Sequence, residues 1–233
     1  MNKPLELLCA GAAQGLVKAL QERFFADTGT RVNARFGAVG AIKELLLSGE
    51  PCDVMVATEA MIDALADEGR LQAATRQPLG RVRTGLAVRS GEPRPDVSTP
   101  EALTAALLAA ETIFFPDPVR ATAGIHFANV MRELGIHDEL QPRFRNFPNG
   151  ATSMRELAAT SAPRQIGCTQ ITEINYTEGI ALLGALPDRF ELATVYTAAT
   201  NTNAAQPELA RRFIALLAGT DSLALRQAGG FEF

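Results

Sequence analysis

The apolar positions of this chain change repeatedly from a strand period to a helix period. Residues 5–10 are a short apolar run, and residues 31–36 alternate apolar with polar side chains, as a half-buried strand does. Each is followed by a stretch whose apolar residues recur every three or four positions, as on one face of a helix. The expected helical faces are Leu16, Val17, Leu20 and Phe24; Ile42, Leu45 and Leu46; and Ile62, Leu65 and Ala66.

A third strand is expected at residues 53–57, which gives three strand–helix units in the first part of the chain. Strands that alternate with helices in this way form parallel sheets, because each helix carries the chain back to the starting edge by a right-handed crossover. The pattern therefore predicts an α/β fold with a parallel sheet.

The second half of the chain repeats this alternation after a longer strand at residues 81–89 and a Gly- and Pro-rich stretch at residues 90–100. Thr99 is a good N-cap residue with Pro100 at the first helical position, so a helix should begin there. Further strands are expected at 112–115, 143–147, 165–168 and 191–197, a helix should bury Ile125, Ala128, Met131 and Leu134, and two final helices should begin at Pro207 and Asp221.

These elements predict two domains. The first is discontinuous, residues 1–84 plus 193–233, and the second is the insertion, residues 85–192. The prediction rests on the long strand before the Gly- and Pro-rich stretch and on the later strand that returns the chain to the first domain.

The composition and net charge restrict the classes of partner that we expect this protein to bind. The 233 residues are 47% apolar and 21% charged with a net charge of −4, an ordinary globular balance with no basic block for nucleic acid. No apolar run is long enough to span a membrane, so we expect a protein that is not membrane-embedded, and we expect a monomer. Cys9, Cys52 and Cys168 have no metal-ligand or disulfide spacing, so we expect buried free thiols and no metal or cofactor.

The first residues of the sequence are relevant to where in the cell the protein is located. Met1-Asn2-Lys3-Pro4 leads into the first strand without the apolar stretch and small-residue cleavage site of an export signal. We therefore expect a periplasmic protein if such a signal has been removed, and a cytoplasmic protein otherwise.

Five turns share one design, in which a strand ends, small or polar residues follow, and a helix begins. They are residues 11–15, 37–40, 120–124, 149–153 and 168–170. Helix N-termini attract anions, and ligands of open α/β sheets bind at the carboxyl ends of the strands. Two such sheets facing each other would gather several helix N-termini around a small anion. The plainer alternative for residues 37–40 is a tight connection in which glycine supplies a positive φ.

The order and spacing of these segments resemble the type II periplasmic-binding-protein fold, in particular the molybdate-binding proteins of ABC importers, over nearly the whole chain. The similar segments are Gly11-Ala12-Ala13, Phe36-Gly37-Ala38-Val39-Gly40, residues 48–54, residues 117–124 and Gly230-Phe231. The resemblance implies two Rossmann-like parallel-sheet domains with a ligand cleft between them, a small anionic ligand and an ABC-importer permease as partner.

This chain departs from the family where the ligand is expected. Family members that bind molybdate or tungstate use serine hydroxyls in the first two loops, where this chain has Ala12 or Ala13, and Ala38. The family's later tyrosine is replaced within residues 168–170. The expected ligand-binding residues are Ala12, Ala13, Gln14, Ala38, Val39, Arg120, Thr122, Ala123, His126, Asn149, Thr169 and Gln170.

The charged and titratable candidates each have a plain alternative. Arg120 could pair with a carboxylate or be a solvated loop residue, and His126 could face the ligand or be a half-buried capping residue. His137 follows a glycine turn and is expected on the surface. Glu173 and Glu178 could serve as bases, but nothing in the sequence places them near a substrate.

Two functions from different classes fit these observations. The first is a solute-binding protein for a small anion, more readily a carboxylate than a tetrahedral oxyanion, because two hydroxyl donors are missing. The second is a small-acid isomerase resembling aconitate isomerase on the same scaffold, with His126, Arg120 and Thr169 as the first catalytic candidates. A cytoplasmic ligand sensor is a third possibility.

Overall fold

Two strands carry the chain from one structural unit to the other and back. In the computed structural model, which describes residues 3–233, unit 1 is Met1–Val82 with Thr194–Phe233, and unit 2 is Arg83–Ala193. The crossings lie inside β4 (Gln77–Arg89) and β9 (Ala193–Thr200). The sequence-based domains, residues 1–84 plus 193–233 and residues 85–192, remain a prediction. Residues 1–2, where the question of an export signal arose, lie outside the described residues.

Unit 1 is built on a sheet in which three parallel strands and one antiparallel strand follow the order β2-β1-β3-β9. The strands β1 (Leu5–Ala10), β2 (Val32–Gly37) and β3 (Val54–Thr58) pair in parallel, as the strand–helix alternation predicts. β9 pairs antiparallel with β3, because it arrives from unit 2 and not through a helical crossover. The α/β class is confirmed, and this sheet is mixed.

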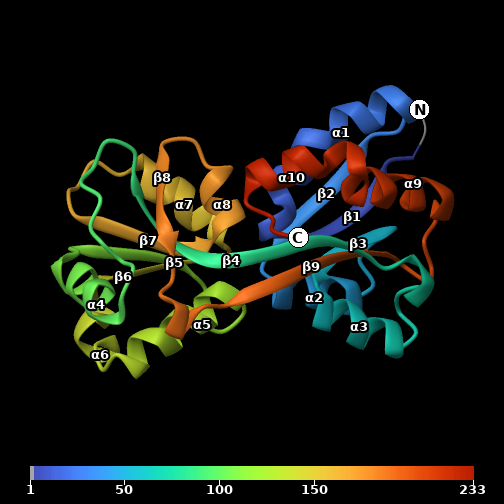
Figure 1. The fold of residues 1–233 in the computed structure, drawn as a ribbon. Coiled ribbons are helices and arrows are strands. Elements are labelled where there is room, and N and C mark those ends of the chain that lie inside the picture. The colour runs from blue at the N-terminus through green and yellow to red at the C-terminus, as the bar shows by residue number, and fades with distance from the viewer. Residues whose placement is uncertain (1–2) are drawn as a thin grey trace. The chain divides into compact units, whose positions relative to one another are not determined.

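Helices cover both faces of this sheet (Figure 1). One face carries α1 (Gln14–Thr28), α9 (Pro207–Ala218) and α10 (Leu223–Gly229), and the other α2 (Val39–Leu47) and α3 (Glu59–Asp67). Phe24 of α1 meets Phe213 of α9 edge to face, with ring centroids 4.9 Å apart. The predicted face of α1 is confirmed, since all four of its expected residues are buried. Short 3₁₀ turns stand at Gly11–Ala13, Ala73–Thr75 and Thr220–Ser222.

Unit 2 has a mixed sheet in the order β4-β7-β5-β6, with β8 paired to β4. Its further strands are β5 (Thr112–Pro116), β6 (Phe144–Phe147), β7 (Gln165–Gln170) and β8 (Ile180–Ala185). β5 pairs in parallel with β6 and β7, whereas β4 runs antiparallel to β7 and β8. β8 was not expected, because its apolar run shows neither period clearly.

The helices of unit 2 cover both faces of its sheet (Figure 1). They are α4 (Pro100–Ala109), α5 (Thr122–Glu133), α6 (His137–Leu140), α7 (Gly150–Ala159) and α8 (Ile171–Asn175), with 3₁₀ turns at Gln141–Arg143 and Asp188–Phe190. The predicted start of α4 is confirmed, because the Thr99 side chain accepts the Ala102 N–H at 3.1 Å.

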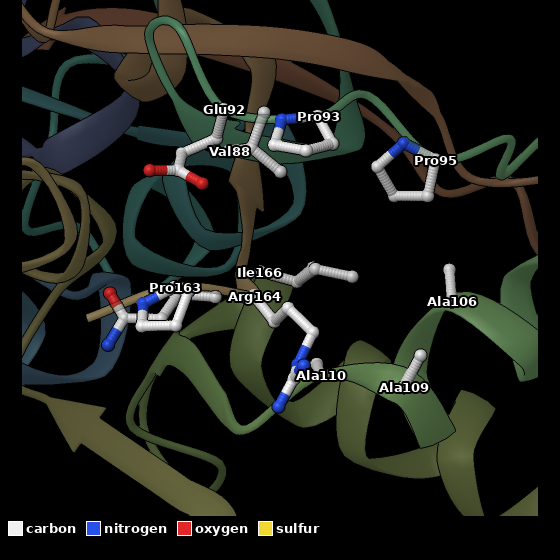
Figure 2. Close-up of a pocket in the computed structure, with 11 residues that line it drawn as sticks. Val88, Glu92, Pro93, Pro95, Ala106, Ala109, Ala110, Pro163, Arg164 and Ile166 are labelled. Carbon is white, nitrogen blue, oxygen red and sulfur yellow. The ribbon is translucent and has the colours of Figure 1, made fainter.

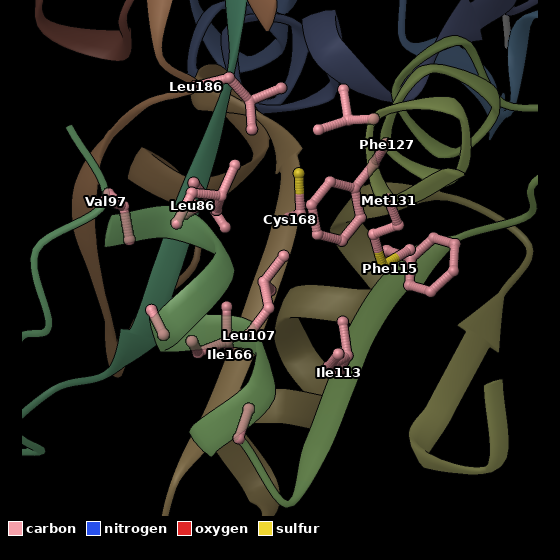
Figure 3. Packing of buried hydrophobic residues seen from close by; sticks show 14 of the residues in the cluster. Leu86, Val97, Leu107, Ile113, Phe115, Phe127, Met131, Ile166, Cys168 and Leu186 are labelled. Carbon is pink, nitrogen blue, oxygen red and sulfur yellow. The ribbon is translucent and has the colours of Figure 1, made fainter. Parts of the chain in front are cut away.

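Successive residues of a strand point to opposite faces of the sheet, and in unit 2 they pack into two separate apolar clusters. Ile113 and Phe115 point into the larger cluster, and Phe114 between them points into the smaller one. The larger cluster packs β4, β5 and β7 against α4 and α5, as Figure 3 shows. Its centre is Phe115, whose ring lies edge to face with those of Phe127 at 5.4 Å and Phe144 at 5.0 Å.

Two sequence-based expectations about side-chain exposure were wrong. Ile125 was expected on the buried face of its helix, but it is 40% exposed, whereas Ala128 and Met131 of the same expected face are buried, together with Phe127 and Val130. His137 was expected on the surface, but it is half-buried. Its ring lies edge to face with Phe144, at 5.4 Å between centroids.

The three cysteines are buried free thiols, as the sequence predicts. Burial raises the pKa of Cys9 and Cys168 well above the ordinary range, and it raises the pKa of Cys52 to about 12. These thiols are therefore protonated and unreactive at neutral pH.

A buried carboxylate joins distant segments of unit 1. Asp53, just before β3, is 2% exposed. Its two oxygens accept the backbone N–H groups of Glu6 in β1 and of Gln206 at the start of α9, both at 2.9 Å. Charge-assisted bonds of this kind are stronger than neutral ones, so Asp53 fixes the beginning of α9 against the sheet.

We expect Asp53→Ala to lower the free energy of unfolding by about 3 kcal/mol, because it leaves two N–H groups without an acceptor. Urea denaturation measures the change. Asp63→Ala is the matched control, because Asp63 pairs with Arg76 at the surface and should cost about 0.5 kcal/mol. Equal effects of the two substitutions would contradict the role assigned to Asp53.

Candidate functional site

The register of unit 1 brings the first two predicted loops together. β1 and β2 are parallel neighbours, and Ala10 lies opposite Gly37 at their carboxyl ends. The residues that follow, Gly11–Ala13 on one strand and Ala38 on the other, therefore leave the same edge of the sheet side by side. The sequence placed both loops at a ligand edge, and within unit 1 they are adjacent.

Alanines occupy the N-cap positions of both helices at this edge. Ala13 is the N-cap of α1 and Ala38 that of α2, and neither helix has a side-chain cap or an acidic residue in its first turn. The first N–H groups of a helix have no partner within it, and they carry its positive partial charge. Ala12, Ala13, Ala38 and Val39 are all buried, so this edge offers backbone donors and almost no polar side chain. Gln14, the first residue of α1, is half-buried.

The glycines of the second loop do not serve a left-handed turn. Neither Gly37 nor Gly40 has a positive φ. α2 begins at Val39, so Gly40 lies inside its first turn and the connection is shorter than the four residues expected. Backbone strain therefore does not explain these glycines.

In unit 2, the loop after β5 leads to another helix of the same kind. α5 has Ala121 as its N-cap, no side-chain cap and no acid in its first turn, and Thr122 and Ala123 are its first residues. Gly124 is the third residue of this helix and does not open it, contrary to expectation. A Cβ at this position would lie 2.3 Å from the carbonyl oxygen of Pro116 and 2.4 Å from that of Asp117. Glycine thus lets the helix begin directly against the end of β5.

Asp117 shapes the loop that carries Arg120. One oxygen of its carboxylate accepts the N–H of Val119 at 2.7 Å and that of Arg120 at 3.1 Å. This side-chain turn holds the backbone of the loop between β5 and α5. Arg120 itself is exposed, one residue before the N-cap of α5.

The N-terminus of α7 already holds a carboxyl group of the protein itself. The Asn149 side chain accepts the Thr152 N–H at 2.8 Å. The carboxylate of Glu173, from the first turn of α8, accepts the Ala151 N–H at 3.2 Å and the Thr169 hydroxyl. Asn149 and Thr169 were expected to bind the ligand, but both side chains have these internal partners.

The contact between α7 and Glu173 is close. A Cβ at Gly150 would lie 2.0 Å from Glu173 Oε2 and 1.8 Å from Thr169 Oγ1, so only glycine fits at the first position of α7. Burial raises the pKa of Glu173, while hydrogen bonds from Thr169 and from the backbone of Ala151 act in the opposite direction. Glu173 was considered as a base, and the structure makes it the internal acceptor of this helix terminus.

Gln170 is a polar candidate whose side chain has no hydrogen-bond partner among residues 3–233. It ends β7, is 2% exposed, and neither atom of its amide group is hydrogen-bonded. Thr84 lies directly opposite it on β4, and its buried hydroxyl also has no partner, nor does that of Thr172. The two threonines were missed by sequence reasoning, because a single threonine in an apolar stretch is ordinary in strands. A buried polar group without a partner is unfavourable, and a ligand or water that reaches it removes that penalty.

His126 is half-buried on α5, and its Nε2 lies 2.7 Å from the carbonyl oxygen of Phe190. A carbonyl only accepts, so Nε2 carries the hydrogen and Nδ1 of the neutral ring keeps its lone pair. Glu178 is exposed in the turn after α8, away from these contacts.

The raised pKa of Glu173 predicts a pH-dependent stability. The folded protein retains a proton that the unfolded chain releases above its ordinary pKa of 4.5, so wild-type stability falls as the pH rises from there toward the raised value. Glu173→Gln removes this loss, and its stability relative to the wild type should increase with pH. Urea denaturation from about pH 4 to about pH 8 measures this.

Glu178→Gln, at an exposed glutamate close in sequence, is the control and should show no such trend. A relative stability of Glu173→Gln that decreases with rising pH would show that the fold favours the charged form, and the prediction would be wrong.

Comparisons with known proteins identify the family and the fold of this chain. Aconitate isomerase of Pseudomonas sp. is 25% identical over 237 residues, which cover 98% of this chain and 87% of that protein. The periplasmic molybdate-binding protein of Azotobacter vinelandii superposes with a TM-score of 0.79 at 20% identity, covering 98% of this chain and 99% of that one. The sulfate-binding protein SubI of Mycobacterium tuberculosis superposes with a TM-score of 0.73 at 16% identity. The superposition covers 99% of this chain and 86% of that one.

Residues 5–232 match the family described as bacterial extracellular solute-binding protein. The match spans nearly all of the described residues, and the strands and helices that carry the candidate residues lie within it. The chain therefore belongs to this family of bacterial extracellular solute-binding proteins and has the type II periplasmic-binding-protein fold.

Proposed function

We propose that this protein is a solute-binding protein whose ligand is a small anion bearing carboxylate groups. The observation that carries the proposal is the set of helix N-termini with alanine caps: α1 and α2 in unit 1 and α5 in unit 2. Other helices that follow sheet strands carry an acid in the first turn, Glu59 in α3 and Glu173 in α8, and α7 is capped. The donors of α1, α2 and α5 have no such neutralising group.

The number of donors favours a carboxylate over a tetrahedral oxyanion. A carboxylate has two oxygens to satisfy, whereas molybdate and sulfate have four, and a desolvated anion needs most of its lone pairs paired. This chain has Ala12 or Ala13, and Ala38, where the molybdate-binding proteins that the sequence resembles use serine. Aconitate, named by the Pseudomonas relative, is a tricarboxylate.

Arg120 is the charged group we assign to one carboxylate. It lies in the loop that Asp117 holds, next to the uncapped start of α5, so a planar carboxylate could accept from the guanidinium and from backbone N–H groups together. Gln170, with its unpaired buried amide, is the neutral group we assign to the ligand in unit 2. The expectation that one ligand contacts both units remains a prediction.

The family supports a periplasmic location and a permease of an ABC importer as the partner. No helix within residues 3–233 has both the length and the apolar composition that crossing a bilayer requires.

An isomerase acting on a small carboxylic acid is the second candidate. Two observations favour it: the similarity to aconitate isomerase over 98% of the chain, and the His126 ring, whose Nδ1 lone pair is available as a base. Moving a double bond in such an acid requires a proton to leave one carbon and another to be added at a different carbon. His126 would take the first proton, and Arg120 would stabilise the negative charge on the carboxylate.

Arg120→Ala should weaken the binding of the best carboxylate about ten- to a hundredfold, the loss of one charge-assisted hydrogen bond. A thermal-shift screen of di- and tricarboxylates identifies that ligand, and calorimetry measures its affinity. Arg132→Ala, at an exposed position on the last turn of α5, is the control and should leave the affinity unchanged. The assignment fails if no carboxylate stabilises the protein or if Arg120→Ala binds as tightly as the wild type.

Molybdate, tungstate and sulfate should bind weakly or not at all, because backbone donors alone do not satisfy four oxygens. Calorimetry with each anion checks this. Submicromolar affinity for molybdate would mean that the missing hydroxyls matter less than proposed.

Incubation of the carboxylate ligand with the protein, followed by proton NMR, separates the two candidate functions. A binding protein returns the ligand unchanged, whereas an isomerase converts it and exchanges a carbon-bound proton with deuterated solvent. His126→Gln should abolish any turnover while binding persists, and turnover that survives this substitution would exclude His126 as the base.

A further inference from the structure

Two lysines stand at the same position on the two alanine-capped helices of unit 1. Lys18 is the fifth residue of α1, and Lys43 is the fifth residue of α2. Lysine is rare in this chain, since only three of its 22 basic residues are lysines, and the third is Lys3, before β1. Both helices begin at the edge of the sheet where β1 and β2 end. The two lysines are therefore placed alike relative to the donors of that edge.

The fifth position keeps each charge close to the helix start at little cost to the helix. A cation in the first turn opposes the positive partial charge of a helix N-terminus, but this effect falls off beyond that turn. The first and fifth Cα atoms of a helix are separated by about 6 Å along its axis, and side chains tilt toward the N-terminus. The flexible four-carbon stem of lysine can therefore bring its ammonium group to the helix start.

The contact that Lys18 makes agrees with this direction. Its Nζ lies 5.9 Å from the centroid of the Phe36 ring. Phe36 is on β2, one residue before Gly37, which lies opposite Ala10 at the carboxyl ends of the two strands. Lys18 is exposed, and a cation–π contact at an exposed site is weaker than a charge-assisted bond to a carboxylate. Its ammonium group is therefore available to an anion at this edge.

Neither lysine is paired with an acid of the protein. Lys18 and the half-buried Lys43 form no ion pair with any of residues 3–233. Arginines elsewhere are compensated: Arg35 on β2 pairs with Glu50, and Arg164 at the apolar pocket of unit 2, which Figure 2 shows, pairs with Glu111. The lysines thus add uncompensated charge beside helix N-termini that are themselves positive.

We propose that Lys18 and Lys43 are the charged contacts of unit 1 for the ligand and that they select for two or three carboxylates. The inference rests on the proposed function, because it concerns the same donor edge. The two lysines lie on helices that cover opposite faces of the sheet, so together they offer positive charge to more than one carboxylate (Figure 1). A monocarboxylate leaves one of these charges unpaired, and it therefore binds more weakly.

Three acids that differ by one carboxylate at a time test the proposal by calorimetry on the full chain. Tricarballylate has three carboxylates, glutarate lacks the central one, and butyrate lacks one more. We expect the affinity to rise in the order butyrate, glutarate, tricarballylate. Lys18→Gln and Lys43→Gln should each weaken tricarballylate binding about tenfold, the loss of one charge-assisted bond, and reduce its advantage over butyrate.

Lys3→Gln is the matched control and should leave all three affinities unchanged. Lys3 is exposed, and it precedes β1 at the other end of the strand from Ala10, roughly 20 Å away. Circular dichroism of each variant verifies that the fold is retained.

Tricarballylate binding that neither Lys18→Gln nor Lys43→Gln weakens overturns the inference and leaves the proposed function standing. Equal affinities of the wild type for the three acids, or an equal loss in Lys3→Gln, also overturn it. If none of the three acids binds saturably, the inference is wrong, and the thermal-shift screen of carboxylates decides separately whether the proposed function stands.

Discussion

Backbone N–H groups at the start of a helix must find an acceptor, and this requirement organises the functional edges of the protein. Strands that end at one edge of a sheet send several helices away from it, so their unpaired donors gather there. In unit 2 the chain itself satisfies the start of α7: Glu173 and Asn149 occupy its N-terminus, and Gly150 provides the room. The helices α1, α2 and α5 begin with alanine instead.

This difference accounts for the selectivity we propose. The internal carboxyl group of Glu173 already occupies the terminus of α7, which removes that terminus from competition for the ligand. The remaining donors are backbone groups, to which Arg120 adds charge and Gln170 a neutral amide. A ligand with planar, two-oxygen groups matches this set better than a tetrahedral anion.

Much of the fold could be predicted from the sequence, since local period and capping signals dominate it. β1 was predicted to the residue, and Thr99 was recognised as a cap. The role of Glu173 could not be predicted, because its acceptor bond spans 22 residues and depends on how two helices meet. Ile125 was misplaced because positions spaced strictly by three drift around a helix of 3.6 residues per turn, so Ile125 lies off the face that buries Ala128 and Met131. β8 was missed because its apolar run shows neither period clearly.

The central claim is that the alanine-capped helix N-termini bind the ligand and that α7 does not. Backbone amide chemical shifts of the isotopically labelled protein, titrated with its best carboxylate ligand, test this directly. The account predicts large shifts for the N–H groups of Ala12, Gly40 and Ala123, and little change for Ala151, whose partner is Glu173. Large shifts at Ala151 with none at the other three would contradict it.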